Sequence, residues 1–261
     1  MRLGAGIAAV VTGGGSGLGA ATARALAERG VKVAVFDVNE AEGRKSAKAI
    51  GGEFFTCDVA SEASVKSALA AARAAHGPER ILVNCAGIAV GMRTVRRVKE
   101  TGAIEPHDIP AFARCIEVNL IGTFIMIAKS AAGMMRAKPL NGDGERGVII
   151  NTSSVAAEDG QLGQVAYAAS KGGVLAMTLP VARDLAREGI RVVTILPGLF
   201  ETSMFGSLPD EARQALAAQV PFPSRLGSPA EFAALAVHIC ENSMLNGASI
   251  RLDGAIRLAP R

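Results

Sequence analysis

The chain has 261 residues, a length that suits one large domain or two small ones. Hydrophobic residues make up 49% of it and aromatic residues only 4%, so its core must consist mainly of alanine, valine, leucine and isoleucine. The net charge of +4 comes from basic residues scattered along the chain, which gives no sign of a nucleic-acid-binding surface. No apolar run is expected to reach the roughly 18 residues that a membrane-spanning helix needs.

The cysteines and the first residues of the chain indicate a cytoplasmic protein. No two of the four cysteines form a CxxC pair, and no cysteine or histidine spacing is typical of zinc or haem, so we expect reduced thiols and no metal. Residues 1–6 lead directly into an apolar strand that the following motif requires, which argues against a cleaved signal or transit peptide.

Short apolar runs alternate with alanine-rich amphipathic stretches along most of the chain. This regular alternation predicts an α/β fold with a doubly wound parallel sheet covered by helices on both faces. No linker or repeat interrupts it, so we expect a single domain, residues 1–261. The expected strands are 7–11, 31–37, 53–58, 81–84, 147–151 and 192–196, and the expected helices are 17–29, 41–49, 61–75, 112–138 (beginning nearer 109) and 166–188.

Two long connections break this alternation, and connections of such length are usually functional loops or lids. The second, 200–226, contains three prolines and a helical pattern near 210–219. The first, 91–110, is polar and carries four basic residues: Arg93, Arg96, Arg97 and Lys99.

A glycine-rich turn follows the first expected strand and opens the first expected helix. Within it, Gly15, Gly17 and Ala20 match the Gly-x-Gly-x-x-Ala spacing of turns in which a pyrophosphate meets the amides of a helix amino terminus. Glycines also serve plain tight turns. However, Asp37 ends the second strand 22 residues after Gly15, where a carboxylate accepts hydrogen bonds from the adenosine ribose. Because a carboxylate there repels a 2′-phosphate, the pattern favours NAD over NADP.

Tyr167, the only tyrosine, lies four residues before Lys171, so a helix would place both side chains on one face. A free tyrosine has a pKa near ~10, and we expect the neighbouring ammonium to favour the phenolate and lower that pKa. A tyrosine tuned in this way can exchange a proton with an alcohol or a carbonyl oxygen. A tyrosine and a lysine at this spacing also occur on ordinary exposed helices, so the interpretation depends on the other motifs.

Taken together, these motifs resemble those of the short-chain dehydrogenases/reductases. The ordered set comprises the glycine-rich turn, the stretch 84–87, Asn119 within a long helix, Ser154, and Tyr167 with Lys171, and it covers essentially the whole chain. The resemblance implies a single Rossmann domain with its active site at the carboxyl ends of the strands. It implies NAD contacts at Gly13, Ser16, Gly17, Leu18, Gly19, Asp37, Asp58, Val59, Asn84, Ala86, Gly87, Tyr167, Lys171, Pro197, Gly198 and Thr202.

The resemblance also implies a catalytic set that interconverts a secondary alcohol and a ketone. In this set Tyr167 exchanges the proton, Ser154 holds the substrate oxygen and Lys171 binds the nicotinamide ribose. Asn119 interrupts its helix and holds a water, although a polar residue bonding locally within a helix is the alternative. Ser153 and Ser154 could both simply end a strand, but the family spacing favours Ser154. The implied substrate contacts are Ser154, Gln161, Gln164, Tyr167, Leu199 and Phe200.

Motifs away from the catalytic set resemble one subgroup, the type II 3-hydroxyacyl-CoA dehydrogenases, also called type 10 17β-hydroxysteroid dehydrogenases. This resemblance implies a 3-hydroxyacyl-CoA substrate, whose phosphates the basic insertion could meet; an ordinary solvated loop is the alternative. Residues expected to cover the acyl chain are Leu199, Phe200, Met204 and Phe205. The stretches that carry the resemblance are 84–90, 147–152, 160–164, 197–200, 219–227 and 250–257.

Other functions remain open. Reduction of a 3-oxoacyl group on a carrier protein, or of a small ketone or steroid, is the alternative enzyme function, and a scaffold or RNA-processing partner is the non-enzyme one. Glu158 and Glu201 depart from the subgroup pattern beside the expected pocket and bear on the substrate range. The resemblance suggests a homotetramer, and small residues on a second helix face predict its contacts: Ala128, Ala131, Ala132, Gly133, Gly172, Gly173 and Ala176.

Overall fold

A computed structural model describes residues 1–202 and 209–260 of the chain. Within them, a seven-stranded parallel sheet has the strand order β3-β2-β1-β4-β7-β8-β9. The order reverses direction next to β1, as in a doubly wound sheet, so the predicted fold is confirmed. The strands are β1 (Ala8–Thr12), β2 (Lys32–Asp37), β3 (Glu53–Thr56), β4 (Ile81–Asn84), β7 (Gly147–Thr152), β8 (Ile190–Pro197) and β9 (Ser249–Leu252).

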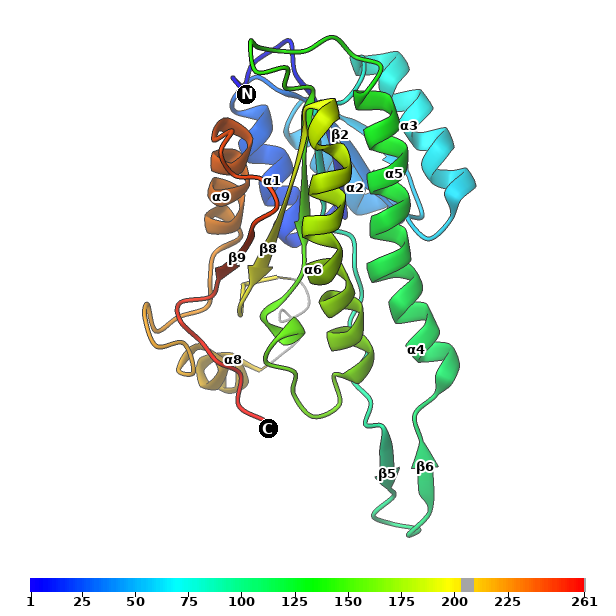
Figure 1. Ribbon diagram of the computed structural model, residues 1–261. Helices are drawn as coiled ribbons and strands as arrows, with labels where there is room; N and C mark the ends of the chain where they lie inside the picture. Colours follow the sequence, from blue (N-terminus) through cyan, green and yellow to red (C-terminus); the bar gives the residue numbers. More distant parts are fainter. Residues whose placement is uncertain (203–208, 261) are drawn as a thin grey trace.

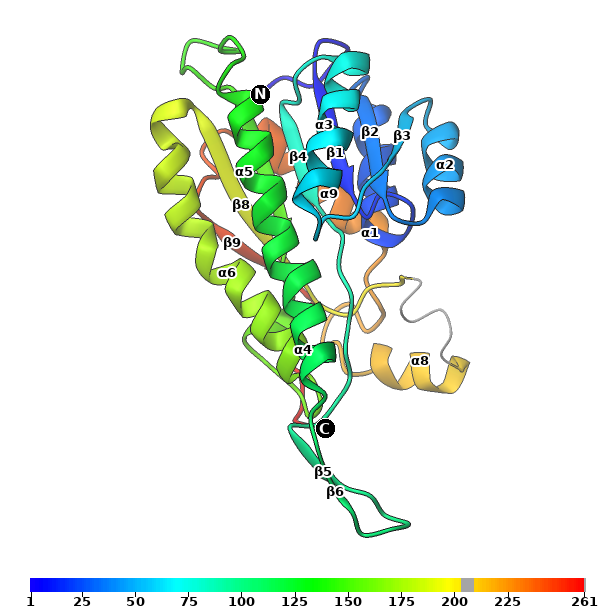
Figure 2. The same ribbon diagram turned by 90° about the vertical axis from the view of Figure 1, so that its right-hand side faces the viewer.

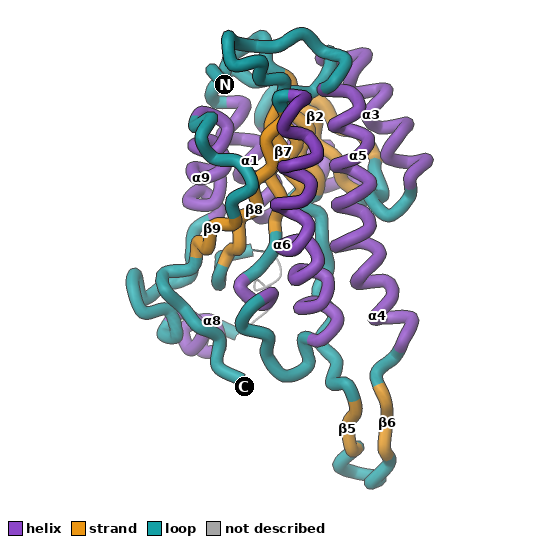
Figure 3. Tube along the Cα trace, viewed as in Figure 1, coloured by secondary structure: helices purple, strands orange, loops and turns teal. Residues whose placement is uncertain are grey.

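Helices cover both faces of this sheet (Figures 1 and 3). Successive residues of β1 point to opposite faces, so Val11 packs in one hydrophobic cluster with α1 and α9, and Val10 in another with α3, α5 and α6. Both valines are fully or almost fully buried, as expected for a strand covered on both sides. The helices are α1 (Gly17–Ala27), α2 (Glu40–Ala49), α3 (Glu62–His76), α4 (Ile109–Ile116), α5 (Thr123–Met134), α6 (Val165–Leu185), α8 (Asp210–Ala217) and α9 (Pro229–Glu241).

Two parts of the fold go beyond the predicted elements. After residue 226 the chain forms α9 and then β9, which adds the last strand to the sheet. A capping box begins α9: Ser228 and Glu231 each bond the other's backbone amide, a signal already present in the sequence. The insertion folds as an antiparallel hairpin of β5 (Val95–Arg97) and β6 (Ile104–Pro106), which projects away from the sheet in both ribbon views (Figures 1 and 2).

The long helix expected at 112–138 contains an irregular turn. A π-helical turn, Glu117–Gly122, separates α4 from α5. Gly122 is required there because a Cβ added to it would lie 2.8 Å from the Val59 side chain. Such a turn inserts an extra residue into the helix and often marks a functional site.

Two helical stretches, Ile109–Met134 and Val165–Glu188, are long and apolar enough by composition to cross a membrane. The expectation that no stretch meets this condition was therefore wrong. Core helices of soluble proteins meet the same condition, and both stretches here pack their buried residues against the parallel sheet. The finding is weak evidence for a membrane.

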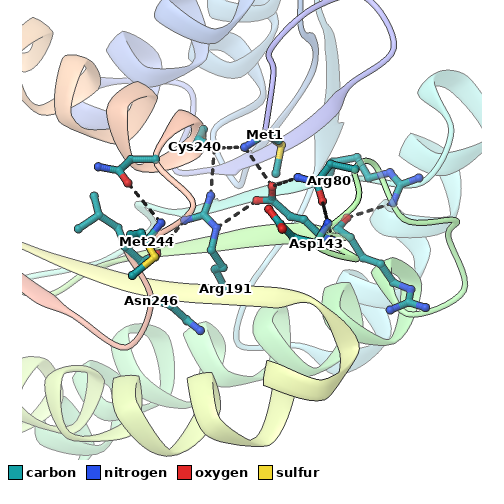
Figure 4. Close-up of polar contacts among 12 residues, drawn as sticks. Met1, Arg80, Asp143, Arg191, Cys240, Met244 and Asn246 are labelled. Atoms are coloured by element: carbon teal, nitrogen blue, oxygen red, sulfur yellow. Dashed lines mark hydrogen bonds and ion pairs between the residues drawn. The ribbon is translucent and has the colours of Figure 1, made fainter.

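A buried cluster of charges lies at the amino ends of β7 and β8 (Figure 4). The Glu145 carboxylate accepts from Arg191 Nε at 3.0 Å and pairs with the Met1 ammonium at 3.1 Å. Arg191 also donates to the carbonyls of Cys240 and Leu245, so it links β8 to the last turn of α9 and to the connection between α9 and β9. The cluster therefore fixes the end of the sheet that lies opposite the site described next.

Candidate active site

A cavity of about 550 Å³ opens at the carboxyl ends of the parallel strands, where ligands bind in doubly wound folds. The turns after β1, β4, β7 and β8 line it, together with α6. It brings together these predicted site residues: Gly13, Ser16, Gly17, Leu18, Gly19, Asp37, Asp58, Val59, Ala86, Gly87, Ser154, Gln161, Gln164, Tyr167, Lys171, Pro197, Gly198, Leu199, Phe200 and Thr202.

The glycine-rich turn after β1 forms one wall of the cavity. Gly13 has a φ of +62°, and a Cβ added there would lie 2.8 Å from the Ala86 backbone nitrogen. Gly19 packs so closely on the Gly13 carbonyl that no side chain fits between them. Ser16 caps α1 in an extended conformation without a side-chain hydrogen bond, so the amino terminus of α1 faces the cavity uncovered by its own cap. This arrangement suits an anionic diphosphate.

Asp37 lies at the carboxyl end of β2 in a fixed orientation. Its Oδ2 accepts from the Gly15 amide and its Oδ1 from the Asn39 amide, both at 2.9 Å. The carboxylate thus lines the cavity beside the glycine turn, where it can accept further bonds from a ribose. The narrow glycine cradle and this anchored acid fit the adenosine diphosphate half of a dinucleotide.

Of the residues predicted to contact the cofactor after β3 and at the end of β4, some line the cavity and one does not. Asp58 and Val59 line the cavity, and Arg114 of α4 lies 3.8 Å from the Asp58 carboxylate. Asn84 differs from its prediction: its side chain is 3% exposed and donates to Asn151 Oδ1 at 2.9 Å. It is not among the described residues that line the cavity. Because Asn84 and Asn151 are paired residues of β4 and β7, the amide links two strands beneath the site.

Tyr167, Ser154 and Lys171 converge at the inner end of the cavity. Ser154 follows β7, while Tyr167 and Lys171 lie one turn apart on α6. The Lys171 ammonium is 5.8 Å from the centre of the Tyr167 ring and donates to the Thr152 carbonyl at 2.7 Å. The Ser154 hydroxyl is hydrogen-bonded to the Tyr167 hydroxyl. The helix therefore presents the acid/base pair as the spacing predicted.

The pKa values differ from the expectation. Burial raises the pKa of Tyr167 above its ordinary value, and the hydrogen bond with Ser154 only partly opposes this effect. Burial also lowers the pKa of Lys171 to about 8. Burial takes both side chains out of water and disfavours the charged form of each. This desolvation outweighs the expected lowering of the tyrosine's pKa by the lysine.

Asn119 is held within the π-helical turn. Its Oδ1 accepts from the Ile88 amide at 2.8 Å, and its Nδ2 donates to the Ile88 carbonyl at 2.8 Å and to Ser170 Oγ at 3.0 Å. A Cβ on Gly87 would lie 3.2 Å from Asn119 Oδ1 and 3.6 Å from Lys171 Nζ. The amide therefore ties the turn after β4 to α6 directly beside Lys171.

Ser153, which the family spacing did not favour as a site residue, also bonds a residue of the active site. It is 1% exposed, and its hydroxyl donates to the Lys171 carbonyl at 2.7 Å. The two serines thus have separate tasks: Ser153 holds the backbone of α6, and Ser154 faces the Tyr167 hydroxyl. Both residues follow β7, and in the sequence the family spacing alone favours Ser154 as the residue that holds the substrate oxygen.

The outer end of the cavity contains the predicted substrate residues. Gln161 and Gln164 bond each other through their side chains at 3.2 Å. Glu158 is turned to Arg251 and, like Glu201, is not among the described lining residues. Met204 and Phe205, predicted to cover the acyl chain, lie outside the described residues. Lining residues that the sequence motifs did not indicate include Val155, Leu216 and Leu258.

Comparison with known proteins establishes the family. The family model of the short chain dehydrogenases matches residues 7–213. The chain therefore belongs to the short-chain dehydrogenase family, whose members are NAD(P)-dependent oxidoreductases, and its motifs mark it as an enzyme of that kind.

Individual relatives are similar over nearly the full length. The rat protein named 3-hydroxyacyl-CoA dehydrogenase type-2 is 52% identical over 98% of this chain and 97% of its own. The human protein of the same name is 51% identical over the same shares. A crystal structure of 3-hydroxyacyl-CoA dehydrogenase type-2 from Mycobacterium avium superimposes with a TM-score of 0.92 at 41% identity, covering 98% of both chains.

Proposed function

We propose that the protein interconverts 3-hydroxyacyl-CoA and 3-oxoacyl-CoA with NAD as its cofactor. The observation that carries the reaction type is the convergence of Ser154, Tyr167 and Lys171 in a cavity that has the glycine-rich turn as one of its walls. The acyl-CoA substrate is supported by the names of the relatives that share about half of the sequence.

The preference for NAD rests on Asp37. Both of its oxygens are fixed by backbone amides, so the carboxylate cannot easily turn away from a 2′-phosphate. Two like charges held close together in a cavity oppose binding, whereas ribose hydroxyls can donate to the same oxygens.

The reaction follows from the placement of the side chains. NAD would supply the hydride acceptor when bound between the glycine turn and Lys171. In alcohol oxidation Tyr167 accepts the hydroxyl proton as its phenolate, a form that the positive charge of bound oxidised NAD would favour against the effect of burial, and in reduction its hydroxyl returns that proton. Ser154 donates to the substrate oxygen and stabilises the negative charge that develops on it. Lys171 would hold the nicotinamide ribose, while Asn119 donates to the Ser170 side chain and Ser153 to the Lys171 carbonyl, which fixes α6 at this point.

Initial rates with purified protein test this function. Reduction of acetoacetyl-CoA with NADH should proceed with a kcat/KM at least about a hundredfold above that with NADPH, because the phosphate meets Asp37. Asp37→Asn should narrow this difference, whereas Glu40→Gln, which removes an exposed acid paired with Arg44, should leave it unchanged. Equal rates with both cofactors would contradict the assignment of Asp37, and inactivity toward every 3-oxoacyl-CoA would contradict the substrate.

We also propose that the protein is a cytoplasmic homotetramer. The four cysteines are free thiols, and the outer faces of the long helices are apolar: Ile121, Phe124 and Leu179 are each more than 40% exposed. Gly172 has open space beside it, which would let another helix approach. Gly133 and Gly173 instead pack inside the chain, against Arg73 and Leu120, so only part of the small-residue set is available for contacts.

A further inference from the structure

The segment 253–260 follows β9 toward the carboxyl terminus of the chain (Figure 1), and it borders the outer end of the cavity. Leu258 lines the cavity directly. The Ala259 carbonyl accepts from Gln161 Nε2 at 2.8 Å, and the Pro260 carbonyl accepts from the Leu162 amide at 3.1 Å. The segment and the loop 158–164 therefore form one continuous wall beside the substrate residues.

Arg251 joins the two parts of this wall. It is 17% exposed, and its guanidinium donates to Asp159 at 2.6 Å in the loop and to Asp253 at 2.7 Å in the segment. It also donates to the Ile256 carbonyl at 2.9 Å and to Glu158. A planar guanidinium with five donors is suited to such a multiple bridge. Arg251 lowers the pKa of Asp159, so the bridge stays charged at neutral pH.

The loop 158–164 contributes the amides of Gln161 and Gln164 to the cavity lining, whereas the segment 253–260 contributes an apolar side chain, Leu258. Leu258 shares the lining with Leu199, Phe200 and Leu216, while the charged groups of the bridge are not among the described lining residues. An apolar surface of this kind favours a hydrocarbon chain, and the position of its boundary decides how many methylenes are accommodated. Arg251 itself does not touch the cavity, so it can act only by holding Leu258 in place.

We propose that the segment 253–260 sets the acyl-chain length that the enzyme accepts, with Leu258 as the specificity-determining side chain and Arg251 as its positioning residue. This inference rests on the proposed acyl-CoA function. Leu258→Ala deepens the cavity without disturbing the bridge. Arg251→Met keeps the length of the side chain but removes every bond to Asp159 and Asp253.

The test compares kcat/KM for acetoacetyl-CoA and 3-oxodecanoyl-CoA, together with the KM for NADH. In both variants the ratio of kcat/KM for 3-oxodecanoyl-CoA to kcat/KM for acetoacetyl-CoA should rise by about tenfold or more, because each methylene newly accommodated contributes to binding. The KM for NADH should stay unchanged. Arg257→Met is the matched control: Arg257 is 65% exposed and, among the described residues, bonds Asp253 and the Ile256 carbonyl but not the loop 158–164, so this variant should have the wild-type ratio.

An unchanged ratio in Leu258→Ala would overturn the role of the segment, even if Arg251→Met were too unstable to assay. A rise in the KM for NADH that parallels any change in the ratio would show that Arg251 has only a general structural role. A wild-type enzyme that reduces neither thioester would overturn the proposed function as well, a result seen before any variant is compared.

Discussion

At the scale of single residues, Tyr167 combines proton transfer with a buried position beside Ser154. Tyr167→Phe keeps the ring but removes the hydroxyl that exchanges the proton. We expect turnover to fall at least about a hundredfold, within the range that general acid–base catalysis contributes. NADH binding, followed by fluorescence, should stay near that of the wild type. A variant that retained turnover would show that Tyr167 is only a packing residue.

Lys171 gives stability a dependence on pH. Its pKa falls from 10.5 to about 8 on burial, so its ammonium destabilises the folded chain below pH 8. This cost disappears as the pH rises from about 8 to about 10.5, because the folded chain then releases the proton before the unfolded chain does. From about pH 7.5 to about pH 9.5, the free energy of unfolding should rise by about 2 kcal/mol more in the wild type than in Lys171→Met.

Urea denaturation of the cofactor-free protein at the two pH values measures this difference. The thiols of Cys57 and Cys240 have pKa values that burial raises and that do not depend on Lys171, so their contributions are common to both proteins and cancel. Lys66→Met is the control, since Lys66 is 61% exposed and should respond like the wild type. Parallel pH responses of the wild type and Lys171→Met would contradict the effect of burial.

The residue motifs predicted most of the lining of the cavity because each motif has a fixed place at the end of a strand. They did not reveal which way a side chain turns. Asn84 ends β4 and bonds Asn151, and Glu158 follows β7 and bonds Arg251. Both partners come from distant parts of the chain, 67 and 93 residues away, so local patterns carry no information about them.

At the scale of elements, the β5–β6 hairpin offers a test of the coenzyme A hypothesis. Arg96 pairs with Glu105 at 2.6 Å, so its charge is balanced locally, whereas Arg97 donates to the Gly102 carbonyl and has no carboxylate partner in the part of the chain that the structure describes. Arg93 forms no ion pair within residues 1–202 and 209–260. The hairpin's base is joined to the outer end of the cavity through the Met92 amide and the Gly163 carbonyl.

Removing the two uncompensated charges, Arg93→Ala with Arg97→Ala, should raise the KM for acetoacetyl-CoA about tenfold and leave that for a small ketone unchanged. Binding energy from the remote phosphates would be lost in the first case only. Arg96→Ala should have a smaller effect. If both substrates respond alike, the hairpin is a solvated surface.

The regular elements were predictable where a strand and a helix alternate, because burial on both faces leaves continuous apolar runs. The hairpin was not, since its strands have three residues each and are exposed throughout. The π-helical turn was not visible in the apolar pattern, which continues through α4 and α5, but it includes Asn119, where the family resemblance implied an interruption of the helix.

At the scale of the whole molecule, the exposed apolar helix faces predict assembly. Light scattering should give four times the chain mass of 26.7 kDa. Phe124→Glu places a charge on the 52% exposed position of α5 and should lower the mass, because the charge would be buried at a subunit contact. Ile104→Glu changes an exposed position on the hairpin and should leave the measured mass unchanged. A monomeric wild type would overturn the tetramer.

The charge cluster at the amino ends of β7 and β8 has a consequence for how this enzyme can diverge. Glu145 and Arg191 hold one end of the strands through buried bonds, while Ser154 and the outer cavity wall follow the other end. Substitutions in the loop 158–164 or at Leu258 therefore leave this anchor intact. Variant libraries confined to the cavity wall can therefore change the substrate preference, while the bonds that stabilise the opposite end of the sheet stay in place.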